Sequence, residues 1–125
     1  PDGRTQTDCD KCNKHKVDLD ISIHFNSGAA DQKGNGKTTG TEVYVYSTKS
    51  AAYPVAERID KAIAVLGFRD RGVKVRTNLY VLHRTNSPAM LIECCFVDDK
   101  DDVKLYDAKK MAQAIVTGIL SSVKK

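Results

Sequence analysis

Polar and apolar residues alternate strictly over residues 18–26, which read DLDISIHFN. An extended strand with this period places Leu19, Ile21, Ile23 and Phe25 on one face and polar side chains, one of them a histidine, on the other. We therefore expect a strand whose apolar face packs against a hydrophobic core. The pattern alone leaves two purposes open for the polar face: ordinary solvent-facing surface, or the wall of a site.

The pattern after this strand predicts a loop, a second strand and a helix. Residues 27–40 are rich in glycine and small polar side chains, which is typical of a long loop, and a loop that directly follows a strand often borders a site. β-Branched and aromatic residues predict a strand over residues 41–47. Apolar side chains then recur at helical spacing over residues 50–66, with Pro54 in the first turn and Gly67 at the end: Val55, Ile59, Ile63 and Leu66.

The second half of the chain continues this alternation of strands and helices. Residues 73–77 and 80–85 are expected to be short extended segments, and the nearly continuous apolar run over residues 89–97 predicts a central strand covered on both faces. A helical region begins within residues 98–102, and apolar residues at helical period continue it over residues 105–119. We therefore expect one α/β domain, a three-layer sandwich with a mostly parallel twisted sheet flanked by helices.

Composition narrows the class of protein. The 125 residues suffice for one domain with a modest core, and contents of 41% hydrophobic and 29% charged residues are typical of a globular protein. No apolar run approaches the roughly 20 residues that span a bilayer, and no signal-peptide pattern is present. The net charge of +4 favours approach to an anionic polymer, but the lysines are scattered, so we expect neither a nucleic acid nor a membrane as partner. The chain begins PDGRTQTD without a methionine, so we expect a processed or cut amino terminus.

The four cysteines are too sparse for a disulfide framework. Cys94 and Cys95 are neighbours, and on a regular strand they cannot both point inward. The segment CDKCNKH, with Cys9, Cys12 and His15, is similar to half of a zinc knuckle, but no second ligand pair follows at similar spacing. We therefore expect free thiols in a reducing or anaerobic setting.

Glu93 is the most informative polar residue, because it lies in the middle of the predicted central strand, in LIECCF. An ionised carboxylate buried alone is costly, and its pKa rises strongly. Such a residue is retained where a cation or metal lies nearby, or where it acts as an acid–base group. The structural alternatives are a place at the exposed carboxyl end of the strand and an ion pair with an arginine such as Arg84.

His24 lies near the carboxyl end of its predicted strand, where ligand crevices open in α/β sheets. Neutral imidazole is a common zinc ligand, and Asn26 or a backbone carbonyl is able to fix its tautomer; the alternative is a solvated surface histidine. A histidine and a carboxylate at strand ends fit a hydrolytic zinc site in which Glu93 takes and returns protons. A catalytic zinc takes three protein ligands, and spacing does not supply the other two. The sequence around His15 and His83 points less clearly to a site.

Three segments together resemble the zinc-dependent N-acetylmuramoyl-L-alanine amidases of bacterial autolysins and phage endolysins: DLDISIHFNSG, GTEVYVYS and PAMLIECCFVDDKDD. The family pattern has an aspartate and two apolar residues before Ser-Ile-His-x-Asn, then Gly-x-Glu and an aromatic strand. A strand with Pro, apolar residues and Glu-x-x-Phe, followed by an acidic helix start, comes later. The match in order and spacing covers nearly the whole chain. It implies an α/β fold and cleavage, by zinc-activated water, of the amide between N-acetylmuramic acid and the L-alanine of peptidoglycan.

The resemblance also implies roles for individual residues. His24 matches the zinc-binding histidine, and Glu93 matches the catalytic glutamate, which assists deprotonation of water and protonates the leaving amine. The loop over residues 27–40 corresponds to one that borders the substrate groove. Cys95 stands where the family usually has glycine, and we expect this change to be tolerated because cysteine is small and often buried.

A larger departure lies at the amino end. The family's first strand, with a Gly-His-Gly-type zinc histidine, and the next helix, with a zinc glutamate, have no counterpart in residues 1–17. We therefore expect residues 1–125 to be the carboxyl-terminal portion of a single amidase catalytic domain, completed by a missing amino-terminal segment. Alone, these residues should bind zinc weakly and hydrolyse nothing.

Two other functions stay open beside the amidase. One is a catalytically inactive amidase-like module that binds or regulates the cell wall, and the other is a different zinc amidohydrolase or peptidase. For the amidase we expect an extracellular place of action at the bacterial cell wall, reached by secretion or phage delivery. The sequence does not distinguish a phage lysin from a host autolysin.

Overall fold

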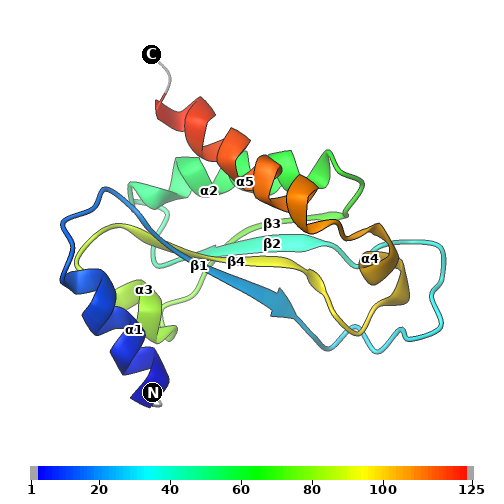
Figure 1. Ribbon diagram of the computed structural model, residues 1–125, viewed down its shortest axis with the longest axis horizontal. Coiled ribbons are helices and arrows are strands. Elements are labelled where there is room, and N and C mark those ends of the chain that lie inside the picture. The colour runs from blue at the N-terminus through cyan, green and yellow to red at the C-terminus, as the bar shows by residue number, and fades with distance from the viewer. Residues whose placement is uncertain (1–2, 124–125) are drawn as a thin grey trace.

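A four-stranded sheet with helices on both faces forms the centre of the computed structural model, which describes residues 3–123 (Figure 1). The strand order is β1-β4-β2-β3. Along the chain the elements are α1 (Gly3–Asn13), β1 (Asp20–Asn26), β2 (Thr41–Val45), α2 (Ala52–Ala64), β3 (Asp70–Val75), α3 (Tyr80–Arg84), β4 (Ala89–Phe96), α4 (Lys100–Leu105) and α5 (Ala108–Val123). The layered α/β architecture predicted from the sequence is confirmed.

The sheet is mixed rather than all parallel, and two of its three strand pairings are parallel, in agreement with the expectation of a mostly parallel sheet. β1 pairs with β4, and β2 with β3, in parallel, whereas β2 and β4 run antiparallel. Parallel neighbours need a crossover connection, and α2 supplies one between β2 and β3. The segment between β3 and β4 contains only the short α3 and returns the chain at the same end of the sheet, so β4 runs opposite to β2 and β3.

Helices α2 and α5 lie side by side over one face of the sheet and cover the main core (Figure 1). Ile59 and Ile63 of α2 are fully buried, as the helical period predicts. The two helices approach closely at Gly118, where a Cβ atom would lie 2.6 Å from the Cα of Ile59. The helix expected over residues 105–119 is interrupted, because Tyr106 has an extended ψ of 130° and separates α4 from α5.

Helices α1 and α3 lie on the opposite face, at one end of the sheet (Figure 1). The prediction of an extended segment over residues 80–85 is wrong, because these residues form the single helical turn of α3. Leu82 of this turn is buried against Ala89 and Leu91 of β4, and this tertiary packing outweighs the strand preference of the local sequence. Helix α1 has no amphipathic pattern that predicts it, because its residues are mostly polar.

The apolar face of β1 is only partly covered. Leu19 and Ile21 pack against the core, but the side chains of Ile23 and Phe25 are 58% and 46% exposed. β1 is the edge strand of the described sheet, and α2 and α5 lie over its centre. At this end of β1, Phe25 makes an edge-on ring contact with Tyr106, with centroids 5.2 Å apart. The expectation that this whole face is buried is therefore wrong at the carboxyl end of the strand.

Cys94 and Cys95 are both buried, contrary to the expectation for a regular strand. The register explains this result: His24 pairs with Glu93, whereas Asn26 pairs with Phe96, so β4 contains one extra residue here. Such an irregularity interrupts the alternation of side chains. Both cysteines consequently belong to the main core, and Cys95 has no positive φ, so the position does not require glycine.

A loop over residues 27–40 connects β1 to β2, as the sequence predicts, and aspartates that follow β4 hold it in place. We call these four residues the acidic clasp: Asp98, Asp99, Asp101 and Asp102. Their carboxylates accept hydrogen bonds of 2.7–3.3 Å from backbone N–H groups of the loop. The donors are Gly28, Ala29, Ala30, Asn35, Gly36, Thr39 and Gly40.

The acidic clasp also fixes strained and buried backbone. Ala30 is the one non-glycine residue of the described chain with a positive φ, at 51°, and its N–H group donates to Asp98. Asp102 accepts a further hydrogen bond of 2.7 Å from the N–H group of Phe96 at the end of β4. The loop is thus fastened beside the carboxyl ends of β1 and β4.

Candidate active site

Three titratable side chains come together on the sheet face opposite α2 and α5. Glu93 of β4 is the register partner of His24 on β1 and of Glu42 on β2. Register partners on neighbouring strands project to the same face of a sheet, with their Cβ atoms close together. The two residues predicted from the sequence, His24 and Glu93, are therefore brought side by side, and Glu42 joins them.

Glu93 carries an unsatisfied carboxylate oxygen. Its Oε1 atom is buried and has no hydrogen-bond partner among the described residues. Burial raises the pKa of Glu93, and the negative charge of Glu42 raises it further. The structural alternative of an ion pair with Arg84 is wrong, because the guanidinium of Arg84 lies over the ring of Tyr80, 5.5 Å from its centroid.

Both carboxylate oxygens of Glu42 have partners, in contrast to those of Glu93, although only 3% of the Glu42 surface is exposed. Its Oε1 forms ion pairs with Lys74 and, at 3.3 Å, with Arg71, and its Oε2 accepts from Asn26 at 2.6 Å and Tyr44 at 3.0 Å. Burial alone would raise the pKa of Glu42, but the hydrogen bonds from Lys74 and Tyr44 lower it below its usual value. Glu42 is therefore a fixed anion beside Glu93.

Sequence patterns predict no role for Glu42 beyond the motif that contains it. The one local feature that points to Glu42 is a charged residue within a strand of β-branched and aromatic residues, TEVYV. Its partners Asn26 and Lys74 come from other strands, so only the fold reveals the network. Asn26 donates to Glu42 in this network, and Ser22 is the hydrogen-bond partner of His24, with Ser22 Oγ 2.7 Å from His24 Nε2.

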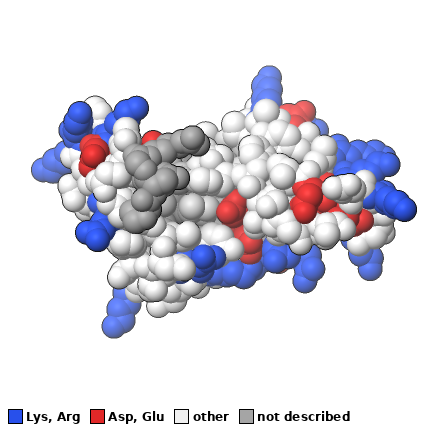
Figure 2. All heavy atoms as spheres, turned by 90° about the horizontal axis from the view of Figure 1, so that it is seen from below, with Lys and Arg blue, Asp and Glu red and all other residues white. Residues whose placement is uncertain are grey.

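His24 is exposed and borders a cavity of about 360 Å³ between β1, α1 and α3. The cavity is lined by Asp8, Ser22, His24, Asn78, Leu79, Tyr80, Val81 and Leu91. Viewed from this side, acidic atoms gather near the centre of the molecule and at the end where α4 and the 27–40 loop lie (Figure 2). Lysine and arginine atoms lie mostly around the margin of this face.

His24 and Glu93 fit a zinc centre by the chemistry of their donor atoms. Imidazole nitrogen and carboxylate oxygen are ligands that zinc accepts. The buried, unpartnered Oε1 of Glu93 is an atom that a cation or a proton satisfies. A second acidic group, with ligand oxygens within 4.8 Å of one another, consists of Asp31, Asp99 and Asp101. Each of these three accepts backbone hydrogen bonds, so their charge is already used to hold the loop.

The other histidines and the amino-terminal cysteines lie apart from this site. His83 packs against the rings of Tyr46 and Tyr80, at centroid distances of 6.2 Å and 5.6 Å. Cys9, Cys12 and His15 lie in and just after α1, and all four cysteines are free thiols, as the sequence predicts.

Comparison with known families shows where this arrangement belongs. The model of the N-acetylmuramoyl-L-alanine amidase family matches residues 3–125. The chain belongs to this family. An uncharacterized cell wall amidase of Bacillus anthracis is 41% identical over 120 residues, covering 86% of this chain and 21% of that protein. The amidase CwlM of Bacillus licheniformis is 33% identical, covering 85% of this chain and 39% of that protein.

A phage protein and solved amidase structures are similar as well. The endolysin of Bacillus phage SPP1 is 33% identical over 86% of this chain and 40% of its own length. The catalytic domain of the CD27L endolysin, which targets Clostridia difficile, matches with a TM-score of 0.80 and 31% identity, over 94% of this chain and 62% of that one. The chain thus spans between about a fifth and two fifths of the curated amidase-family relatives.

Proposed function

We propose that the protein is a peptidoglycan hydrolase that cleaves the amide bond between N-acetylmuramic acid and the L-alanine of the stem peptide. The observation that carries the proposal is Glu93, whose partly buried carboxyl has a raised pKa and an unpartnered oxygen directly beside His24. A raised pKa suits a group that must both accept and donate a proton near neutral pH. Family membership supplies the bond to be cleaved.

In this proposal His24 holds a zinc ion, and Glu93 handles the protons. The ion, when bound, would polarise the scissile carbonyl and lower the pKa of a water molecule. Glu93 takes the proton from the attacking water at its free oxygen and delivers it to the amine that leaves. Glu42, held by Lys74 and Arg71, keeps a negative charge beside Glu93 and thereby favours its protonated form.

A catalytic zinc takes three protein ligands, and on this face of the described sheet His24 is the one histidine beside Glu93. We propose that residues 1–125 are the carboxyl-terminal portion of one catalytic domain and that the other two ligands come from a segment outside them. The open edge of β1 and the exposed Ile23 and Phe25 support this proposal, because a further strand and its helix would cover them.

The proposed place of action is the bacterial cell wall, outside the cell. The net charge of +4 favours approach to an anionic wall polymer. Among the described helices, none combines the length and apolar character that crossing a membrane requires.

Digestion of purified muropeptides tests the proposal. The expected products are free stem peptides with an L-alanine amino end, formed by a protein extended toward the amino end and abolished in its His24→Ala variant. New reducing sugar ends would instead identify a glycosidase. Binding to purified walls without any cleavage would identify the inactive wall-binding module.

The same assay on residues 1–125 alone tests the missing ligands. The proposal expects weak zinc binding and no hydrolysis. If residues 1–125 bind zinc stoichiometrically at His24 and lyse walls as a monomer, the proposal of ligands from outside is wrong, while the amidase assignment stands.

A further inference from the structure

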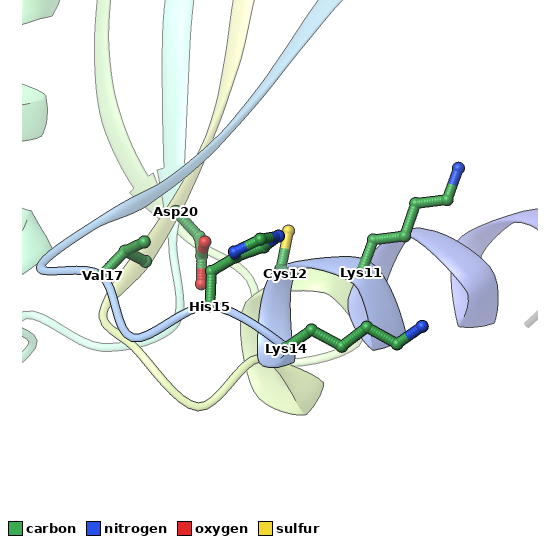
Figure 3. A pocket seen from close by; sticks show the side chains of 6 residues that line it. All are labelled: Lys11, Cys12, Lys14, His15, Val17 and Asp20. Atoms are coloured by element: carbon green, nitrogen blue, oxygen red, sulfur yellow. The ribbon is translucent and has the colours of Figure 1, made fainter.

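A second group of metal-ligating side chains lies at the other end of β1 from His24. A cavity of about 390 Å³ between the end of α1 and the start of β1 is lined by Lys11, Cys12, Lys14, His15, Val17 and Asp20 (Figure 3). The side chains of Cys12, His15 and Asp20 all line this cavity, and Cys12 and Asp20 are hydrogen-bond partners. The proposed amidase mechanism uses none of these side chains.

The buried carboxylate of Asp20 is the feature that indicates a ligand in this cavity. Its side chain lines the cavity, the residue is only 9% exposed, and its Oδ2 atom has no hydrogen-bond partner among the described residues. No lysine or arginine of the described chain forms an ion pair with it. The Cys12 thiol is a hydrogen-bond partner of the Asp20 carboxylate. The buried Oδ2 atom alone is left without a partner, and a bound cation would satisfy it.

Of the two cysteines of α1, Cys12 lines this cavity. Cys9 and Cys12 are three residues apart on the helix and therefore share one face. Cys9 is buried and Cys12 is half-buried, and neither forms a disulfide. His15 follows three residues after Cys12, in the turn that leaves α1. The fold thus adds Asp20 to the Cys-x2-Cys-x2-His spacing, which lacked a fourth ligand in the sequence.

We propose that Cys9, Cys12, His15 and Asp20 bind a structural Zn²⁺ ion that joins the end of α1 to the start of β1. Two thiolates, one imidazole and one carboxylate form a four-ligand set of the kind that zinc prefers over magnesium or calcium. Among the described residues, three ligand atoms lie within 4.8 Å of one another only in the Asp31, Asp99 and Asp101 group. Ion binding at the proposed site therefore requires the side chains of Cys12, which is half-buried, and His15, which is exposed, to rotate toward the ion.

The proposal gives a physical reason for the position of α1. This helix packs mainly on α3, and Asn13 links it to the segment that follows α3 through hydrogen bonds with Arg84 and Asn86. A zinc ion would add a direct link to β1, the strand that carries His24. The site is structural, because all four ligands come from the protein and none faces the proposed reaction centre.

Cobalt substitution tests this site separately from the proposed amidase site. Co²⁺ bound by thiolate gives a sulfur-to-metal charge-transfer absorption, which a site built on His24 without sulfur does not produce. We expect one equivalent of Co²⁺ to give this absorption and Zn²⁺ to displace it. Cys12→Ser should reduce the band to about half, because Cys9 still supplies one thiolate, and Cys9→Ser combined with Cys12→Ser should abolish it. Asp20→Asn and His15→Ala should each weaken metal affinity by at least about ten-fold.

The matched controls are Asp18→Asn, an exposed aspartate two residues before Asp20, and His24→Ala. Both should leave the charge-transfer band unchanged, and His24→Ala should affect wall hydrolysis alone. The proposal is overturned if the wild-type protein gives no band, or if the band persists at full affinity in both Asp20→Asn and His15→Ala.

Thiol modification gives a second readout for the case that a variant folds poorly. We expect Zn²⁺ to slow alkylation of Cys12 in the wild-type protein by at least about ten-fold, with peptide mass analysis locating the modified residue. His15→Ala removes an exposed side chain and should retain the fold, yet it should lose most of this protection. Equal alkylation rates with and without Zn²⁺ in the wild-type protein would contradict the proposal.

Discussion

The acidic clasp and Glu93 of the candidate active site use the same chemical group in opposite ways. Each carboxylate of the acidic clasp accepts two or more hydrogen bonds, mostly from the backbone of the 27–40 loop. Asp99 also accepts from the Thr39 hydroxyl and from the N–H group of Asp101. In the candidate site Glu42 is equally well paired, but Glu93 retains a buried oxygen without a partner. The presence of partners, more than burial, therefore distinguishes the carboxylates of the acidic clasp from Glu93.

The pKa shifts of Asp99 and Glu93 follow the same division, whereas burial raises the pKa of Asp102 in the acidic clasp despite its hydrogen bonds from Phe96, Gly40 and Thr39. Asp99 is fully buried, and burial alone would raise its pKa, yet the hydrogen bonds from Thr39 lower it below the usual range. Glu93 is less buried than Asp99, and its pKa is raised, first by burial and then by the charge of Glu42. A carboxyl group with a raised pKa and a free oxygen is able to exchange a proton, whereas Asp99 is held as an anion.

The substitution Glu93→Gln gives the largest expected effect. It keeps the shape of the side chain but removes the proton acceptor, so hydrolysis of muropeptides by the active enzyme should fall by about 10²–10⁴-fold. The free energy of unfolding should stay the same or rise, because a buried carboxyl without a full set of partners is lost. Activity within ten-fold of the wild type would contradict the assignment of Glu93, whatever the stability.

The substitution Asp102→Asn in the acidic clasp should mainly lower the stability of the fold, whereas Glu93→Gln should mainly lower activity. Asp102 accepts from the N–H groups of Thr39, Gly40 and Phe96, and an asparagine would turn an amide N–H₂ group toward these donors. We expect the free energy of unfolding to fall by about 2–4 kcal/mol, measured by denaturant titration. The exposed Asp18→Asn is the control, with a change near zero. If Asp102→Asn lost activity but kept its stability, Asp102 would not be the structural carboxylate that this comparison requires.

Asp60 of α2 lies outside both the acidic clasp and the candidate active site. The pH dependence of the free energy of unfolding tests how burial affects its carboxyl group. Burial, followed by the hydrogen bond and charge of Asp70, raises the pKa of Asp60 from 3.8 to about 8. Because the folded state holds this proton at a pH where the unfolded chain has lost it, the free energy of unfolding should fall as pH rises from about 4 to about 8. The slope should approach at most about 1.4 kcal/mol per pH unit.

Asp60→Asn should remove this slope and stabilise the protein by about 1–2 kcal/mol at pH 8, because it leaves no charge to bury. Glu57→Gln on the same helix is the matched control and should leave the slope intact. Thermal unfolding from pH 4 to pH 8 measures both variants. An unchanged pH slope in Asp60→Asn would show that Asp60 is ionised in the folded protein.

These comparisons explain which features the sequence could predict. The period of four, four and three predicted α2, and a glutamate inside an apolar run pointed to Glu93, because both signals are local. The pairing of Glu42 with Lys74 and Asn26 joins three strands, so no local pattern contains it. The direction of β4 depends on where the chain re-enters the sheet after α3, which is likewise a property of the whole fold.

The candidate site was predicted in part for the same reason. His24 and Glu93 lie at strand positions that the alternation of polar and apolar residues fixes, and the register then places them side by side. The acidic run DDKDD was read only as a helix start, since its backbone partners lie about 60–70 residues earlier in the chain. The unpartnered oxygen of Asp20 similarly becomes visible only when α1 folds against the start of β1.

The smallest expected effect is that of Asp98→Asn, at the exposed edge of the acidic clasp. Hydrogen bonds from Ala30, Gly28 and Ala29 lower the pKa of Asp98, yet its carboxylate faces water. We expect no measurable change in the unfolding midpoint but faster amide hydrogen exchange at residues 28–30, because their N–H groups lose the charged acceptor. The amides of Asn35 and Gly36, which Asp101 holds, serve as internal controls. Unchanged exchange at residues 28–30 would mean that the loop keeps its shape without Asp98, so that the buried members of the acidic clasp alone hold it.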